Sequence, residues 1–475
     1  MDFKKLENES INKLIIKYAI PATMGMMVNG IYAIVDGIFV GNYVGYYGIA
    51  SVAFAWPFLI SIYGLGIMFG LGGATLISIN LGMKNKDEAE KILSTTFLYM
   101  IIVSAIITIT GMPITEILLK VIGAEGIYYT EALNYSSIFI YGALITLSTV
   151  SFDSLVRNDG FPKKAMYAMA TGAVLNIILD GIAIAILGYG IMGAAVATLL
   201  SQFVVFIIYL EHFLGGKSNL KLKLFEKLDK TSLNNKYNSK KEEILDYLKN
   251  IHTVKKIFLA GFSGFLGEFA FAMLIFVHNI QFLAYGSPLQ VSAFGTVSYL
   301  SGLAFFIIYG VSIGIQPLIS YNYGADKIHR VREIFKKSSL LNLIFGMIIF
   351  AIASIFAEPL VQLFNASDTA FVNASAFGLK IHSAYFAIVG ITLVCITYFQ
   401  SVYKYKISIL LMLARSTIFL IPLIIILPFK YGLEGIWYAM PIAEYLALVV
   451  SLLFVKHHLY DTKKFSKSEI KHVEE

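Results

Sequence analysis

The chain has 475 residues, of which 57% are hydrophobic and only 14% are charged, and its mean hydropathy is +0.74. Soluble globular domains carry about 25% charged residues, so this composition excludes a soluble enzyme or binding module and indicates a membrane protein. The formal net charge is +7. Because the basic residues are spread along one predicted membrane face, we interpret this charge as a topology signal and expect no nucleic-acid partner.

Apolar segments recur along the whole chain, and each is long enough to cross a bilayer as a helix. We place these spans at residues 16–40, 50–79, 93–112, 133–156, 165–187, 193–213, 257–282, 291–320, 339–357, 378–400, 407–428 and 435–455. Residues 1–13 are charged and lead into the first span without a small-residue cleavage site, so we expect an uncleaved first helix. The predicted fold class is an all-α polytopic membrane protein with about 12 transmembrane helices.

A long internal repeat divides these spans into two halves. Residues 72–82 (GGATLISINLG) match residues 314–324 (GIQPLISYNYG) at six of eleven positions, with an offset of 242 residues. The same offset relates residues 189–193 to residues 431–435. Such a period indicates a duplicated half, which is common in secondary transporters. With six spans in each half, the two lobes should be parallel repeats related by a pseudo-two-fold axis along the membrane normal.

The predicted organisation has four regions. They are an N-terminal six-helix lobe (1–213), a cytoplasmic inter-lobe linker (214–256), a C-terminal six-helix lobe (257–455) and a cytoplasmic tail (456–475). Lysine and arginine are concentrated in alternate connections, which places both termini in the cytoplasm.

Three connecting segments also have predicted conformations. We expect the linker to be mainly solvated, with a short amphipathic helix at 241–250 on the membrane surface as the alternative. Residues 113–132 and 358–377 correspond at the repeat offset and are expected to form short interfacial helices.

Two carboxylates lie well inside spans of the first half, Asp36 and Asp180. An ionisable side chain in hydrocarbon is costly, so it indicates a functional site. Helical spacing places each acid on a face with other polar residues: Asn29 and Tyr32 with Asp36, and Asn176 with Asp180. Counting along the spans puts both acids and Thr198 in the outer half of the membrane.

This set of oxygen atoms predicts a cation site. We expect Asp36, Asn176, Asp180 and Thr198 to bind it, because carboxylate, amide and hydroxyl oxygens suit a hard ion such as Na⁺. Two close carboxylates also suit a proton, since like charges raise one pKa. The coupling ion, H⁺ or Na⁺, stays open at this point. The structural alternative is a polar cluster that only holds helices together.

The second half does not repeat these acids, because His278 stands at the position that corresponds to Asp36. Its intramembrane charges are Glu268, Arg415 and Glu444. Glu268 could form an ion pair with Arg415 or face a substrate, and both interpretations remain open. We group four residues as support for substrate binding or coupling: Tyr32, Asn29, Glu268 and Met27. Methionine suits adaptable apolar surfaces, although it also fills cores.

The sequence contains no phosphate-binding loop and no His/Cys metal-binding spacing. We therefore expect no enzymatic activity and no cofactor besides the coupling ion. His278, His382 and the one cysteine, Cys395, are expected to be packing residues.

The chain resembles the multidrug and toxic compound extrusion (MATE) family of secondary transporters over nearly its whole length, apart from the linker. The resemblance rests on residues 35–41 (VDGIFVG), the two repeats, residues 157–162 (RNDGFP) and residues 176–180 (NIILD). In the prokaryotic branch with acids in the N-terminal lobe, the matching positions form the cation-binding and drug-linked site: Asp36, Asn176, Asp180 and Thr198, with Tyr32 beside them.

This resemblance implies antiport by alternating access, in which a cation enters while an organic, often cationic and aromatic, compound leaves. The expected partners are small organic cations or drugs and membrane lipids. The expected setting is a monomer in a bacterial or archaeal cytoplasmic membrane. An alternative is a flippase for lipid-linked oligosaccharides or lipid precursors of the same superfamily, for which Arg415 is the one favourable feature. A non-transporting membrane receptor is a further alternative, but it would not need buried acids in one of two duplicated lobes.

Overall fold

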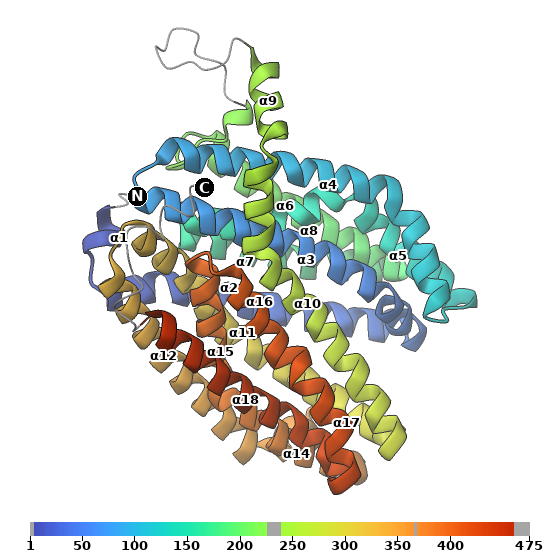
Figure 1. Cartoon of the computed structure of the whole chain (residues 1–475). Coiled ribbons are helices and arrows are strands. Elements are labelled where there is room, and N and C mark those ends of the chain that lie inside the picture. The colour runs from blue at the N-terminus through green and yellow to red at the C-terminus, as the bar shows by residue number, and fades with distance from the viewer. Residues whose placement is uncertain (1–3, 226–238, 365–367, 460–475) are drawn as a thin grey trace. The chain divides into compact units, whose positions relative to one another are not determined.

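The computed structural model describes residues 4–225, 239–364 and 368–459, and every regular element in these ranges is helical (Figure 1). Within these ranges, 11 helices are long and apolar enough to cross a membrane, and a bent pair can supply a twelfth. The predicted all-α polytopic fold with about 12 membrane-spanning helices is therefore confirmed.

The helices of the first half are α1 (Lys4–Asn8), α2 (Ile11–Phe39), α3 (Tyr46–Gly82), α4 (Lys86–Val121), α5 (Gly126–Tyr141), α6 (Ala143–Asn158), α7 (Pro162–Asp180), α8 (Gly190–Leu214) and α9 (Lys240–Lys249). Those of the second half are α10 (Ile251–Tyr285), α11 (Pro288–Gly324), α12 (Ile328–Ile355), α13 (Ala357–Gln362), α14 (Thr369–His382), α15 (Phe386–Ser401), α16 (Tyr405–Leu413), α17 (Leu420–Tyr431) and α18 (Leu433–Leu459). Short π-helical segments are η1 (Val40–Val44), η2 (Gly181–Ile186) and η5 (Ala414–Ile418), and short 3₁₀ segments are η3 (Lys223–Phe225) and η4 (Ser383–Tyr385).

The bent pair consists of α5 and α6, which meet at Gly142 with an angle of 63°. A Cβ atom at Gly142 would stand 2.4 Å from Cδ1 of Leu199 on α8. Glycine therefore leaves room for α8 to pack against the bend.

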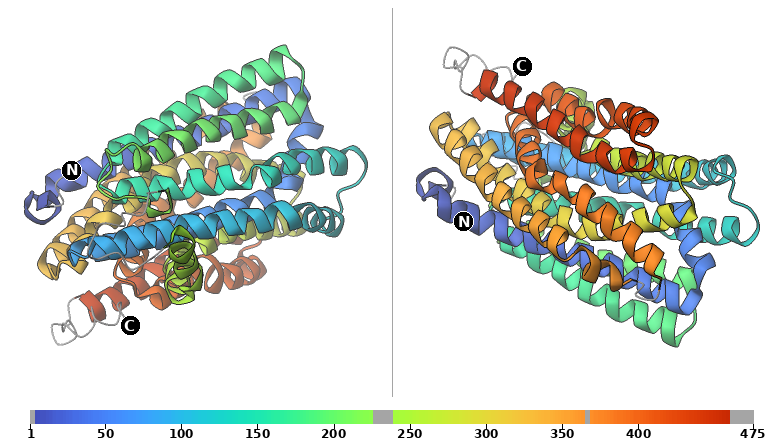
Figure 2. Two further views of the ribbon diagram at one scale, coloured as in Figure 1. Left: turned by 90° about the horizontal axis from the view of Figure 1, so that it is seen from above. Right: turned by 90° about the horizontal axis from the view of Figure 1, so that it is seen from below.

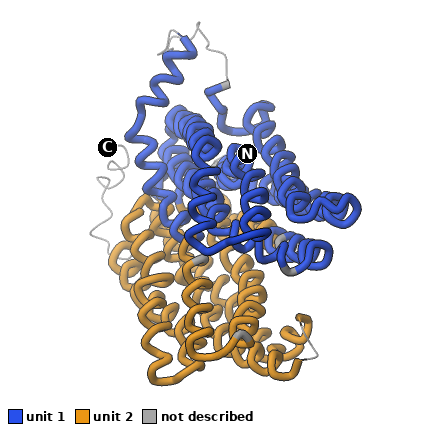
Figure 3. The backbone as a smooth tube through the Cα atoms, turned by 90° about the vertical axis from the view of Figure 1, so that its right-hand side faces the viewer, with its two compact units in different colours: residues 1–8, 28–268, 320–326 blue, residues 9–27, 269–319, 327–475 orange. Residues whose placement is uncertain are grey.

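The chain forms two compact units, which Figure 3 colours separately. Unit 1 contains residues 1–8, 28–268 and 320–326, and unit 2 contains residues 9–27, 269–319 and 327–475. The first part of α2 thus belongs to unit 2, and the first part of α10 belongs to unit 1. The boundaries of the two six-helix lobes, 1–213 and 257–455, remain a prediction.

Glycines at repeat-related positions explain why the first part of α2 packs in unit 2 and the first part of α10 packs in unit 1. In unit 1, a Cβ at Gly72 of α3 would stand 2.0 Å from the carbonyl oxygen of Ile257 on α10. In unit 2, a Cβ at Gly314 of α11 would stand 2.6 Å from Cα of Ala19 on α2. Each half therefore packs its second long helix, backbone to backbone, against the first long helix of the other half. Small residues are what permits such close contact.

The last glycines of the two repeated motifs meet within unit 1. A Cβ at Gly82 of α3 would stand 2.1 Å from the carbonyl oxygen of Tyr321, and one at Gly324 of α11 would stand 2.0 Å from that of Ile79. The duplicated motif therefore acts in packing, at the crossing of α3 with the end of α11.

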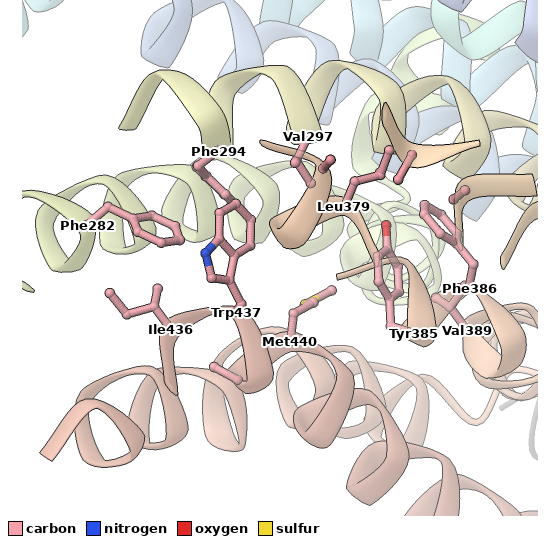
Figure 4. Close-up of a cluster of buried hydrophobic side chains, with 14 of the residues drawn as sticks. Phe282, Phe294, Val297, Leu379, Tyr385, Phe386, Val389, Ile436, Trp437 and Met440 are labelled. Atoms are coloured by element: carbon pink, nitrogen blue, oxygen red, sulfur yellow. The ribbon is translucent and has the colours of Figure 1, made fainter. Parts of the chain in front are cut away.

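Unit 2 has an aromatic core, shown in Figure 4. The Trp437 ring lies 4.6 Å from the Phe282 ring and 6.0 Å from the Phe294 ring, centroid to centroid. His278 stacks on Phe294 at 4.6 Å, and its Nδ1 lies 2.8 Å from the carbonyl oxygen of Leu274. His278 is thus a hydrogen-bonded packing residue, as the sequence indicated.

Two predictions for the connecting segments need correction. The first is residues 113–132, where α4 continues to Val121 and no separate short helix forms. Leu119 is buried in the core of unit 1, and the first residue there with a left-handed backbone is Gly123, with φ of 79°. Nothing therefore ends the helix at Pro113. In the corresponding second segment, the short helix α13 does form.

The second correction concerns the linker, which was expected to be mainly solvated. Residues 240–249 form α9, which packs against α4. In Figure 1 α9 rises from α4, and in the left view of Figure 2 it is seen nearly end-on. Ser239 caps α9, because its hydroxyl accepts a hydrogen bond from the backbone N–H of Glu242 at 3.2 Å. Residues 226–238 of the predicted linker and 460–475 of the predicted tail lie outside the described residues.

The beginning of the linker is also held against unit 1. Asp159, which is fully buried after α6, accepts hydrogen bonds from the backbone N–H groups of Asn219 at 3.1 Å and Leu220 at 3.0 Å. Its carboxylate lies 2.8 Å from Nε2 of His212. Burial raises the pKa of Asp159 above its ordinary value, and the hydrogen bond with His212 opposes that shift.

The glycine crossing yields a stability test on α11. Gly324→Ala should force α3 and α11 apart, because the new Cβ would overlap the carbonyl oxygen of Ile79. The expected cost is about 1–3 kcal/mol of overpacking. Gly295→Ala on the same helix is the control, since a Cβ there would have no neighbour within 4 Å. Thermal unfolding in detergent should show a lower midpoint for Gly324→Ala only, and equal midpoints would contradict this packing role.

Candidate functional site

All four residues of the predicted cation site lie in unit 1. Asp36 is near the end of α2, Asn176 and Asp180 are on the last turns of α7, and Thr198 is on α8. Nδ2 of Asn176 donates a hydrogen bond to Oγ1 of Thr198 at 3.2 Å. The carboxyl groups of Asp36 and Asp180 are close enough for a side-chain hydrogen bond between them. The structure thus brings the four side chains together, while their role remains a prediction.

Several oxygen atoms of this cluster have no hydrogen-bond donor. Among the described residues, Oδ1 of Asp36, both carboxylate oxygens of Asp180 and Oδ1 of Asn176 are buried without a partner. Asp180 is fully buried. Two ionised carboxylates in contact would repel each other, so the pair needs either a shared proton or a bound cation. The available oxygens are of the type that a hard cation prefers.

A π-helical segment follows each acid. Segment η1 begins four residues after Asp36, and η2 begins directly after Asp180. The wider turns are visible in the backbone bonds from Gly45 N–H to Val40 O at 3.1 Å and from Leu187 N–H to Ile182 O at 2.9 Å. The two segments pack against each other and against α8. Such π turns often occur at functional sites.

Three tyrosines lie near the acidic pair, and only Tyr32 was singled out from the sequence. Tyr32, Tyr63 and Tyr135 all lie within electrostatic range of Asp36. Tyr32 and Tyr135 also lie within range of Asp180. The neighbourhood of the pair therefore contains aromatic side chains with polar tips, which suit contact with both an ion and an aromatic compound.

Gln202 on α8 orients Tyr63. The Thr146 hydroxyl donates to Oε1 of Gln202 at 2.7 Å, and Nε2 of Gln202 donates to the Tyr63 oxygen at 2.9 Å. The tyrosine O–H is thereby left without Gln202 as an acceptor, and the Asp36 carboxylate lies within electrostatic range of Tyr63. A sequence signal for Gln202 existed, because it stands one turn after Thr198 on the same helix face.

Comparison with known proteins identifies the family. A family model described as MatE matches residues 21–182 and again residues 265–426, once in each half. The chain belongs to the MATE family. The first match includes three of the four predicted cation-site residues, Asp36, Asn176 and Asp180.

MATE relatives cover nearly the whole chain. It is 25% identical to the multidrug export protein MepA of Staphylococcus saprophyticus over 466 residues, which are 98% of this chain and 97% of that protein. It is 25% identical to MepA of Staphylococcus aureus strain N315 over 450 residues, or 94% of each chain.

Solved structures of the MATE fold are also similar. A MATE structure in complex with MaL6 has a TM-score of 0.88 at 23% identity, covering 98% of this chain and 100% of that one. An outward-facing multidrug resistance MATE family transporter of the MOP superfamily has a TM-score of 0.88 at 22% identity, covering 98% and 99%. At these identities, the likeness shows the fold.

In this MATE protein, unit 2 carries an ion pair in its interior. Nη2 of Arg415 lies 3.1 Å from Oε2 of Glu444, and Nε donates to the same oxygen at 3.1 Å. The guanidinium carbon stands 5.9 Å from the centre of the Phe305 ring. The considered pairing of Arg415 with Glu268 stays a prediction, while the partner of Arg415 within unit 2 is Glu444. Glu444 lies on α18 at the position that corresponds to Gln202 in the first half (444 − 202 = 242).

The other predicted support residues are not joined to the acidic pair by polar contacts. Asn29 on α2 and Glu268 on α10 are half-buried in unit 1, and Met27 is half-buried in unit 2. No hydrogen bond or ion pair within the described ranges connects Asn29 or Glu268 to Asp36 or Asp180. A substrate-binding role for these three residues remains a prediction.

The hydrogen-bond chain through Gln202 predicts a stability effect. Gln202→Leu would leave the Thr146 and Tyr63 hydroxyls without their partner, at a cost of about 1–3 kcal/mol. Ser201→Ala is the neighbouring control, because the Ser201 hydroxyl bonds only within its own helix, to Ala197 O at 2.7 Å. The melting midpoint in detergent should fall clearly for Gln202→Leu and little for Ser201→Ala. The reverse order would contradict this network.

Proposed function

We propose that the protein is a secondary active transporter that exports organic, often cationic and amphipathic, compounds in exchange for H⁺ or Na⁺. The observation that carries this proposal is the cluster of buried oxygens at Asp36, Asn176 and Asp180 that have no donor among the described residues. The names of the MepA relatives, which are multidrug export proteins, support drugs as the exported class.

The cation would bind at the acidic pair. A proton would bridge the Asp36 and Asp180 carboxyls and remove their repulsion. Na⁺ would instead use carboxylate oxygens together with Oδ1 of Asn176 and the Thr198 hydroxyl. In either case Asn176 is held in place by its hydrogen bond to Thr198.

Exchange of a cation for an organic compound follows if both bind to the negative charge of Asp36 and Asp180. Without a bound cation, the acidic pair would attract a cationic compound, and the rings of Tyr32, Tyr63 and Tyr135 would offer cation–π and apolar contact. Cation capture from the outer side would neutralise the pair and release the compound. The transport cycle is then driven by the different affinities of inward- and outward-open states.

The proposal also includes the orientation of the chain in the membrane. Both termini would lie in the cytoplasm of a bacterial or archaeal cell, with lobes 1–213 and 257–455 moving against each other in the cytoplasmic membrane. We propose a monomer as the working form, in contact with membrane lipids.

The flippase alternative is weakened by the ion pair in unit 2. A flippase needs a free cationic group for pyrophosphate. Arg415 is bound to Glu444 at 3.1 Å, so its charge is compensated. We therefore retain export of organic compounds as the proposed function.

Neutralising either acid tests this function. Asp36→Asn and Asp180→Asn should each reduce export of a fluorescent organic cation to the level of transporter-free membranes, because an amide cannot take up a proton and carries no charge to hold Na⁺. Asp87→Asn is the control, since the Asp87 side chain is 96% exposed.

The assay should use proteoliposomes with an imposed H⁺ or Na⁺ gradient. The wild type and the control should respond to at least one of the two gradients, whereas the two site variants should respond to neither while remaining monodisperse in detergent. Full export by both site variants would refute the proposed coupling site.

A further inference from the structure

Helix α9 is fixed to unit 1 by one face. Glu243 and Tyr247 are buried on that face. Oδ2 of Asp246 pairs with Nζ of Lys91 at 3.2 Å, and the Tyr99 hydroxyl donates to the carbonyl oxygen of Leu248 at 3.0 Å. Helix α9 therefore has a defined orientation on α4, and its other face is turned outward.

The contacts on α4 place α9 at a membrane boundary. Lys91 is the last charged residue before the apolar run of α4, which begins at Ile92, and Tyr99 lies eight residues further along. Because α4 is a candidate membrane span and α9 contacts it where its apolar run begins, we place α9 near the level at which water meets hydrocarbon (Figure 1).

The outward face combines lysines with apolar side chains. Lys241, Leu245 and Lys249 follow each other at a spacing of four residues and are exposed, with Leu245 at 39%. The first turns of α10 continue the pattern with Ile251, which is 70% exposed, and the exposed Lys255.

Most acidic side chains of α9 do not lie on its outward face. Asp246 pairs with Lys91, and Glu243 pairs with Lys240 at 2.6 Å. The exposed acid on this helix is Glu242, against two exposed lysines there and a third on α10. The outward face therefore carries a net positive charge.

We propose that α9 and the first turns of α10 bind anionic phospholipid headgroups at the membrane surface. Lys241, Lys249 and Lys255 would contact the phosphates, while Leu245 and Ile251 would enter the upper acyl region. Lysine stems suit this arrangement, because they lie along apolar surface and extend the ammonium to the headgroups. This surface lies in the segment that joins the two repeats and does not depend on the cation site, so it can hold whether or not the proposed export function does.

Lipid binding by the purified full-length protein tests the proposal. Native mass spectrometry would follow retention of phosphatidylglycerol and phosphatidylcholine by the wild type and by the triple variant Lys241→Gln, Lys249→Gln, Lys255→Gln. The control triple variant is Lys86→Gln, Lys163→Gln, Lys217→Gln, which removes the same charge at other exposed positions. Wild type and control should prefer phosphatidylglycerol, and the α9 variant should lose at least about fivefold of this preference, the effect of one lysine at an anionic surface. An unchanged preference, or an equal loss in the control, would overturn the proposal.

A label on α9 gives an independent readout. Cys395 is the one cysteine of the chain and is buried, so Leu245→Cys can be labelled selectively with a fluorophore. In vesicles containing phosphatidylglycerol, a spin-labelled lipid should quench this fluorophore more strongly than aqueous iodide does. The same label at Lys217→Cys should show the opposite order. Stronger quenching by iodide at both positions would mean that α9 faces water or a soluble partner and would reject the lipid assignment.

Discussion

The main physical constraint in unit 1 is the burial of two carboxylates among apolar helices. Asp36 and Asp180 come from helices far apart in sequence, and their oxygens lack donors within the described residues. Such an arrangement is unfavourable unless a positive ion or a proton is present. This unfavourable burial is the physical reason for our proposal that the pair binds a cation. Asn176 and Thr198 stabilise the surrounding geometry through their own hydrogen bond.

The two halves share a repeated packing frame, and they differ in the chemistry of their polar residues. Repeat-related Gly72 and Gly314 still make equivalent crossings, one in each unit. The polar residues have diverged, since the position of Asp36 is occupied by His278, which stacks in an aromatic core. Gln202 in unit 1 corresponds to Glu444, which compensates Arg415 in unit 2. One unit therefore carries an uncompensated acidic cluster, and the other carries a neutral ion pair.

The sequence predicted the membrane helices and the acid cluster because both follow from one-dimensional rules. Apolar runs mark the spans, and helical spacing with depth counting placed Asp36 near Asp180. The partners of Gln202 and Arg415 could not be predicted, since such contacts depend on which helices pack together. Helix α9 was underestimated because its stability comes from docking on α4, which composition does not report.

The most direct test of the account is whether the acidic pair exchanges a cation for cargo in the purified protein. A fluorescent organic cation would be titrated into the detergent-solubilised transporter in weakly buffered solution, while released H⁺ and Na⁺ are measured with an indicator and an ion-selective electrode. If the pair exchanges a cation for cargo, binding of the compound should release one of the two ions in a near-stoichiometric amount. Binding of the compound with no release of either ion would contradict it.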